Sequence, residues 1–113
     1  MVVDSGHADL LFGALADGTR REILALTLTG EHSVSQLARM FPMSFAAVQK
    51  HVAVLERAGL VVKRKQGREQ RVRGNPAAVH EIREALDQLE IRWRQRVDRI
   101  DELLADPDRG DPA

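Results

Sequence analysis

Residues 44–73 read SFAAVQKHVAVLERAGLVVKRKQGREQRVR, and this stretch decides the fold. Its first half places Val48, Val52 and Leu55 at positions i, i+4 and i+7, which is the spacing of one face of a helix. Gly59 follows directly, where a helix commonly ends in a left-handed residue. The first half is therefore predicted to be an amphipathic helix with one buried face.

The second half of the same stretch has the pattern of a β-hairpin. Residues 60–62 are Leu-Val-Val, a combination typical of strands, and Val72 lies in a second short run. Between the two runs Gly67 occupies the position where a tight turn requires a positive φ. We expect two antiparallel strands that project as a wing.

Positive charge is concentrated in these 30 residues. They carry eight Lys and Arg side chains against two acidic ones, a net charge of +6, whereas the whole chain is neutral and the other 83 residues sum to −6. A local cationic surface on a neutral protein points to a polyanionic partner.

A short helix is predicted immediately upstream. Ser33 followed by Gln36 fits a capping box, and Pro42 ends the helix near residue 40. Ser44 then caps the next helix. Two helices separated by such a short connection form a helix-turn-helix. The residues expected to be buried in the first of them are Leu37 and Met40.

Two further helices are expected at the N-terminal side, over residues 7–16 and 18–28. Asp17 precedes the second as an N-cap, and Gly30 ends it. The side chains expected to face inward from the second helix are Ile23, Leu24 and Leu28.

A long helix is predicted from Asn75-Pro76, a cap followed by proline at the first helical position, to about residue 105. Its apolar residues recur at nearly heptad spacing, at Val79, Ile82, Leu86, Leu89, Trp93, Val97, Ile100 and Leu104. So small a domain cannot cover such a stripe, so we expect it to pack against a second copy of the chain.

The predicted fold class is mainly α with a small two-stranded β wing: a winged helix-turn-helix with a long C-terminal dimerisation helix. Residues 1–6 are expected to be a flexible N-terminus, residues 7–105 the domain, with its dimerisation helix over about 76–105, and residues 106–113 a disordered acidic tail.

Several classes of protein are excluded by what the sequence lacks. There is no cysteine for a disulfide, a thiolate nucleophile or a thiolate metal site. No apolar run reaches the roughly 18 residues that a membrane helix needs, and the first residues do not resemble a signal peptide. No phosphate loop or catalytic constellation is present. We therefore expect a cytoplasmic protein that is not an enzyme, has no catalytic residue, uses no cofactor and does not bind membranes.

Double-stranded DNA is the partner that this chemistry favours. The first turn of the second helix of the motif can reach the major groove, where Gln pairs with adenine, Lys with guanine or phosphate, and apolar groups with the thymine methyl. The wing can hold phosphates or enter the minor groove, and the N-terminus of the helix over residues 18–28, with Arg20, can hold another phosphate. The candidate DNA-binding residues are Ser44, Phe45, Ala46, Gln49, Lys50, His51, Arg20, Lys63, Arg64, Lys65 and Arg68.

The chain resembles the ArsR/SmtB group of bacterial winged-helix repressors over about residues 10–80. The similarity lies in an Asp-x-Thr-Arg helix start, a Ser-x-x-x-Val-x-x-His-x-x-x-Leu helix, an Ala-Gly-Leu-Val link and a Gly-Arg wing tip, at residues 17–20, 44–55, 58–61 and 67–68. Gly18 replaces the proline common in the family. The resemblance implies a homodimer, formed by the first and last helices, that binds an imperfect palindrome and represses transcription. The expected interface residues are Leu10, Leu11, Leu86, Leu89, Trp93, Val97, Ile100 and Leu104.

Many members of that family sense metals, but this chain departs from them. Residues 33–35 are Ser-Val-Ser where the thiolate site would need cysteines. His80 and Glu84 are spaced i, i+4, yet that helix has no second histidine, so no metal is expected. Two other readings remain open: a winged-helix module that binds another protein, and a regulator released by a small-molecule effector between the long helices, near Trp93.

Overall fold

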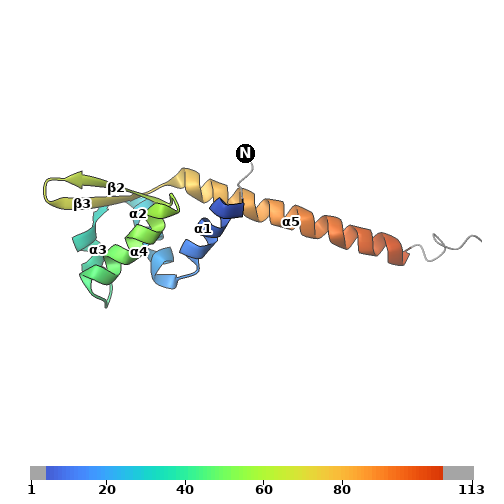
Figure 1. Cartoon of the computed structure of the whole chain (residues 1–113), viewed down its shortest axis with the longest axis horizontal. Coiled ribbons are helices and arrows are strands. Elements are labelled where there is room, and N and C mark those ends of the chain that lie inside the picture. Colours follow the sequence, from blue (N-terminus) through green and yellow to red (C-terminus); the bar gives the residue numbers. More distant parts are fainter. Residues whose placement is uncertain (1–4, 106–113) are drawn as a thin grey trace, which may run out of the picture.

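The computed structural model describes residues 5–105 and contains five helices and three strands within that range (Figure 1). In chain order they are α1 (Ser5–Leu15), α2 (Gly18–Thr29), β1 (His32–Ser33), α3 (Val34–Met40), α4 (Phe45–Arg57), β2 (Val61–Gln66), β3 (Glu69–Gly74) and α5 (Pro76–Ala105). Helix α1 begins at Ser5, two residues before its predicted start. Residues 1–4 and the predicted tail at 106–113 lie outside the described residues.

The predicted helix caps are confirmed. The side chains of Asp17, Ser33 and Ser44 each accept a hydrogen bond from the backbone N–H three residues later. At α3 the side chain of Gln36 also accepts from the backbone N–H of Ser33, which completes the capping box. Each cap satisfies a backbone donor that has no partner inside its helix. The boundaries of α2, α3 and α4 are thus set by side chains close in sequence.

The wing belongs to a sheet of three strands rather than two. Strands β2 and β3 form the predicted hairpin, with Gly67 at φ 63°, and β3 also pairs with β1 in the order β1-β3-β2. In that pairing His32 lies opposite Val72. A strand of two residues is too short to show an alternating pattern, which explains why the sequence did not predict it.

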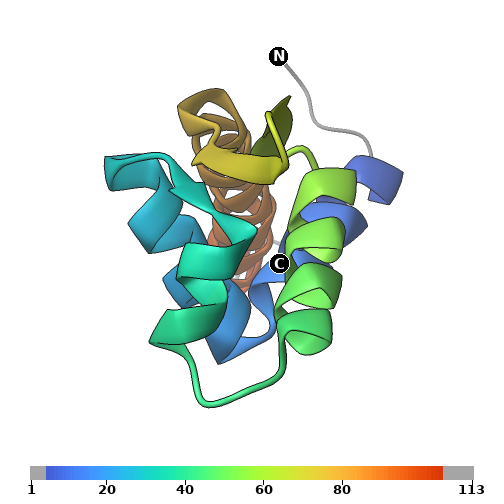
Figure 2. The ribbon, with the colours of Figure 1, turned by 90° about the vertical axis from the view of Figure 1, so that its left-hand side faces the viewer.

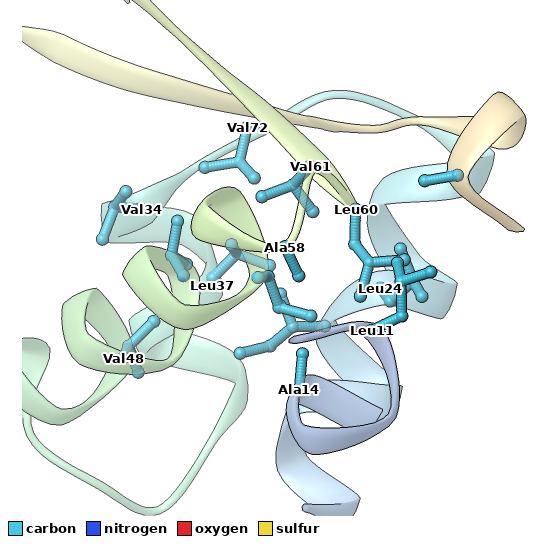
Figure 3. Close-up of a cluster of buried hydrophobic side chains, with 14 of the residues drawn as sticks. Leu11, Ala14, Leu24, Val34, Leu37, Val48, Ala58, Leu60, Val61 and Val72 are labelled. Carbon is cyan, nitrogen blue, oxygen red and sulfur yellow. The ribbon is translucent and has the colours of Figure 1, made fainter. Parts of the chain in front are cut away.

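The core is aliphatic and lies where the sheet meets α1 to α4 (Figure 3). Its fully buried side chains include Leu11, Ile23, Leu37, Leu55 and Leu60. The predicted inner face of α4 is confirmed, since Val48, Val52 and Leu55 are all buried. Packing this face fixes which side of α4 remains outside.

Two residues predicted to be inside are exposed. Met40, the last residue of α3, is 51% exposed, whereas Val34 and Leu37 of the same helix are buried in the core. In α2 the buried position belongs to Thr27, whose hydroxyl donates to backbone carbonyls one turn earlier. Leu28 instead lies on the edge of the fold, against Gly74 of β3.

Helix α5 starts on the body and then leaves it. Asn75 accepts from the backbone N–H of Ala77 and donates to the carbonyl of Gly59, which ties the helix start to the end of α4. Ala78 and Ile82 are buried, and the second half projects beyond the body (Figure 1). The molecule consequently measures 80 × 29 × 23 Å. Within residues 5–105, no helix is both long and apolar enough to cross a membrane.

Candidate nucleic-acid interface

Helix α4 presents its first turn to solvent. Its cap, Ser44, and the side chains of Phe45, Ala46, Gln49 and Lys50 are all exposed, and they lie opposite the buried valines. The face is therefore available over about one and a half turns. Figure 2 shows α4 at the edge of the body, beside α3 and below the sheet.

The chemistry of this face suits the major groove. Gln49 offers both a donor and an acceptor, the combination that pairs with adenine, and Lys50 offers a cation. Lys50 has no hydrogen bond or ion pair to any of residues 5–105. Phe45 and Ala46 add apolar surface that can contact a thymine methyl.

The wing cations fall into two groups. Lys63 Nζ lies 3.4 Å from Glu56 Oε1, and Arg64 Nη2 lies 2.9 Å from Glu31 Oε1. Lys65 and Arg68, at the tip, are exposed and have no ion pair with any other described residue. The four cations predicted to bind phosphate are thus unequal, because acidic neighbours already neutralise two of them.

The acidic partners in the wing were missed by the sequence reasoning. Glu31 pairs with one arginine on each strand of the wing. Its Oε1 contacts Arg64 of β2 and also lies 3.4 Å from Nε of Arg71 of β3. It comes 33 residues before Arg64 and 40 before Arg71, and only the pairing of β1 with β3 brings them together. No local pattern signals such a contact.

Arg20 was expected to bind phosphate, but its side chain faces inward. Its Nε donates to the carbonyl of Ala14 at 2.7 Å and its Nη2 to that of Gly13 at 3.1 Å, while Nη1 lies 3.3 Å from Nδ1 of His51. Only 18% of the side chain is exposed. The guanidinium therefore has partners within the fold, whereas the tip cations Lys65 and Arg68 have none among the described residues.

The carboxyl of Asp17 completes this junction. The backbone N–H of Arg20 donates to its Oδ1, and this bond, with the nearby charge of the Arg20 guanidinium, lowers the pKa of Asp17 below its ordinary value. A carboxyl with a lowered pKa stabilises the fold above the pKa it has in the unfolded chain. That contribution is lost as the pH falls through its folded pKa.

Most residues of the expected dimer interface are exposed on the single chain. On α5 these are Leu86, Leu89, Trp93, Ile100 and Leu104, while Val97 is partly covered. On α1, Leu10 is 44% exposed, but Leu11 is fully buried in the core of its own protomer. Leu11 therefore has no surface to offer a partner: it lies one position, about 100°, further round α1 than Leu10.

The two side chains considered for a metal, His80 and Glu84, contact each other along one helix. His80 Nε2 lies 3.1 Å from Glu84 Oε1. Among residues 5–105, no group of three or more His, Asp or Glu side chains is placed to hold a metal ion.

Comparison with known proteins agrees with this geometry. The family described as "Bacterial regulatory protein, arsR family" matches residues 17–63, from the cap of α2 into β2. The HTH-type transcriptional regulator Rv2034 of Mycobacterium tuberculosis is 38% identical over 84 residues, which cover 74% of this chain and 78% of that protein.

Solved structures show the same fold. An ArsR-like transcriptional regulator from Rhodococcus sp. RHA1 has a TM-score of 0.76 and 34% identity, covering 87% of this chain and 92% of that one. The homodimeric winged helix-turn-helix DNA-binding domain Mb0332 from Mycobacterium bovis, a possible ArsR-family regulator, has a TM-score of 0.63 and 26% identity, over 80% and 90%. The chain therefore belongs to the arsR family of bacterial transcriptional regulators, the family that its sequence resembles, and not to a family of enzymes.

Proposed function

We propose that this protein is a homodimeric transcriptional repressor that binds an imperfect palindromic operator through the major groove. The observation that carries the proposal is the exposed first turn of α4, with Gln49 and Lys50, together with the unpaired cations Lys65 and Arg68 at the wing tip. The helix reads base edges and the wing holds the backbone.

Helix α5 supports the homodimer. Its apolar stripe is exposed along the half that projects from the body, and surface of this kind on a small protein is usually covered by a partner. The homodimeric Mycobacterium bovis neighbour has the same fold.

The sequence of α5 favours an antiparallel pair of helices. The stripe is almost symmetric about residue 91, so that Leu89 faces Trp93 and Leu86 faces Val97 when one helix is reversed. The charges are distributed less evenly: before residue 91 four acids, Glu81, Glu84, Asp87 and Glu90, outnumber Arg83, and after it four arginines, Arg92, Arg94, Arg96 and Arg99, stand against three acids, Asp98, Asp101 and Glu102. In the antiparallel pair Glu90 lies opposite the partner's Arg92, whereas Glu84 lies opposite Asp98, so charge pairing supports the antiparallel arrangement at the centre of the helix alone.

The alternative of an effector pocket at Trp93 has less support. Leu89, Arg92, Trp93 and Arg96 line an open hollow of about 290 Å³. All four come from α5, and in the antiparallel pair the partner's Leu89 would fill this space. We assign Trp93 to the dimer core.

Selection of bound duplexes from a random pool tests the proposal. We expect enrichment of a two-fold motif whose half-sites lie about one helical turn, roughly 34 Å, apart. Gln49→Ala should cost about 1–3 kcal/mol and relax the preference at one position of each half-site. A promoter carrying the selected site should be silenced by the protein in a reporter assay, and stimulation instead would make it an activator.

The rival function, a module that binds an acidic protein through its wing, predicts a different result. The selection would then enrich no motif, and gel shifts would show equal, weak binding to every duplex. That outcome would contradict the proposed function.

A further inference from the structure

Arg20 lies where three helices meet. It belongs to the first turn of α2, its guanidinium reaches back to the end of α1, and it also touches the side of α4 through His51. Among the hydrogen bonds and ion pairs between side chains of residues 5–105, this is the one that joins α2 to α4.

The bonds to α1 are of a strong kind. Gly13 and Ala14 lie in the last turn of α1, where backbone carbonyls have no partner inside the helix and carry the negative end of its dipole. Nε and Nη2 of one guanidinium reach both carbonyls, which fixes the plane of the group. The guanidinium of Arg20 is therefore fixed by α1 independently of its contact with α4.

The contact with His51 then has a defined chemistry. Arginine is always a donor, so Nδ1 of His51 accepts and its proton resides on Nε2. His51 follows Lys50 directly and lies two residues after Gln49, within the turn that faces the groove. A side chain fixed at residue 51 constrains the rotation of α4 about its axis, and that rotation aims Gln49.

We infer that Arg20 is a positioning residue for the reading helix: it links the end of α1 to His51 and so holds α4 in the orientation that meets the bases. The inference rests on the proposed function, and it replaces the expectation that Arg20 itself binds a phosphate. Helix α1 also carries the exposed Leu10, which belongs to the expected dimer face. Arg20 therefore connects that face to the base-reading face of α4.

Salt dependence separates the two roles. A residue that binds phosphate contributes to affinity for every duplex and about 0.9 to the slope of log K against log salt. A positioning residue changes affinity for the operator alone and leaves the slope unchanged. The measurement is therefore binding to the selected operator and to an unrelated duplex, each across a salt series.

The first variant is Arg20→Lys, which keeps the charge but not the planar fork. We expect operator affinity to fall about tenfold, within the usual range for a coupling of this kind, with unrelated duplex binding, salt slope and dimer mass unchanged. Arg21→Lys is the matched control, since Arg21 donates to the carbonyl of Leu15 at 2.6 Å and is exposed. In Arg21→Lys the ratio of the affinity for the operator to the affinity for the unrelated duplex should equal that of the wild type.

The second variant distinguishes the loss of this one contact from a general loss of folding. His51→Ala removes the contact from the α4 side and leaves the cap of α1 intact. It should lower operator affinity to a similar extent, and the double variant Arg20→Lys/His51→Ala should be no worse than either single one.

Two results would overturn the inference. The first concerns Arg20→Gln, a third variant that removes the charge. If it weakens binding to both duplexes equally and reduces the salt slope by about 0.9, Arg20 is a phosphate ligand. The other is an unchanged binding ratio in both Arg20→Lys and His51→Ala. If the selection yields no operator at all, the proposed function fails instead, and the two failures are distinct.

Discussion

Phe45 is an aromatic side chain that points away from the core. It is the first residue of α4 and is 46% exposed, next to the exposed Ala46. In the major groove, the thymine C5-methyl is the apolar group that such a surface can contact. The position of Phe45 therefore favours thymine beside the base that Gln49 is proposed to read.

Replacing thymine by deoxyuridine in the selected operator tests this contact. Removing one buried methyl should weaken wild-type binding about fourfold, which corresponds to ~0.8 kcal/mol. Phe45→Ala should bind both operators equally, because the group that detects the methyl is gone. Gln49→Ala is the control and should remain sensitive. Equal binding of the wild type to both operators would exclude the contact.

Ser33 has a purely structural role at the same scale. Its hydroxyl and Gln36 form reciprocal bonds at the start of α3, and the residue is 2% exposed. Ser33→Ala should lower the free energy of unfolding by about 1–2 kcal/mol, measured as a shift of the denaturant midpoint. Ser35→Ala, in the exposed part of the same turn, should leave the midpoint in place. Similar midpoints for both variants would show that the capping box contributes nothing.

At the scale of the element, the wing is a cationic hairpin with a neutralised base and a free tip. The base is braced by Glu31 and Glu56, whose ion pairs hold Arg64, Arg71 and Lys63. Exposed ion pairs of this kind contribute little stability, but they lower the charge that each cation can offer to a phosphate.

Arg68→Ala and Arg64→Ala should therefore differ. Removing Arg68 should weaken binding to all duplexes and reduce the salt slope by about 0.9, the value for one phosphate contact. Removing Arg64 should change the slope less, because Glu31 already compensates its charge. The two slopes come from the same titrations in increasing salt. A larger slope change for Arg64 would mean that the ion pair with Glu31 opens on DNA.

At the scale of the whole molecule, the projecting half of α5 is explained by a second copy. In an antiparallel dimer it would lie over the partner's body and cover the apolar stripe that one chain leaves exposed. The distance between the two reading helices would then be set by the length of α5.

Cysteine pairs test the orientation, since the chain contains no cysteine of its own. A mixture of Leu86→Cys and Val97→Cys chains should form a disulfide-linked heterodimer on oxidation, because these positions face one another when the helices are antiparallel. Either variant alone should remain uncrosslinked. If Leu86→Cys alone crosslinks to itself, the helices are parallel and the proposed dimer is wrong.

The sequence by itself determined the helices and the hairpin. Caps at Asp17, Ser33 and Ser44 act over three residues, a positive φ at Gly67 acts on one, and helical periodicity acts over a turn. Interactions of such short range involve residues that are close in sequence, so they can be predicted without a structure. The reading face of α4 followed from them, because its buried side was already defined.

The tertiary structure decided what distant residues do to one another. Leu10 and Leu11 are equally apolar, yet only packing assigns one to the surface and the other to the core. Arg20 belongs to a recognisable motif, but only the folded structure shows that its guanidinium contacts both the end of α1 and His51 of α4. These outcomes depend on contacts between different elements, such as that of Arg20 with His51 31 residues later, or on which side of a helix the core lies, and no local pattern encodes either.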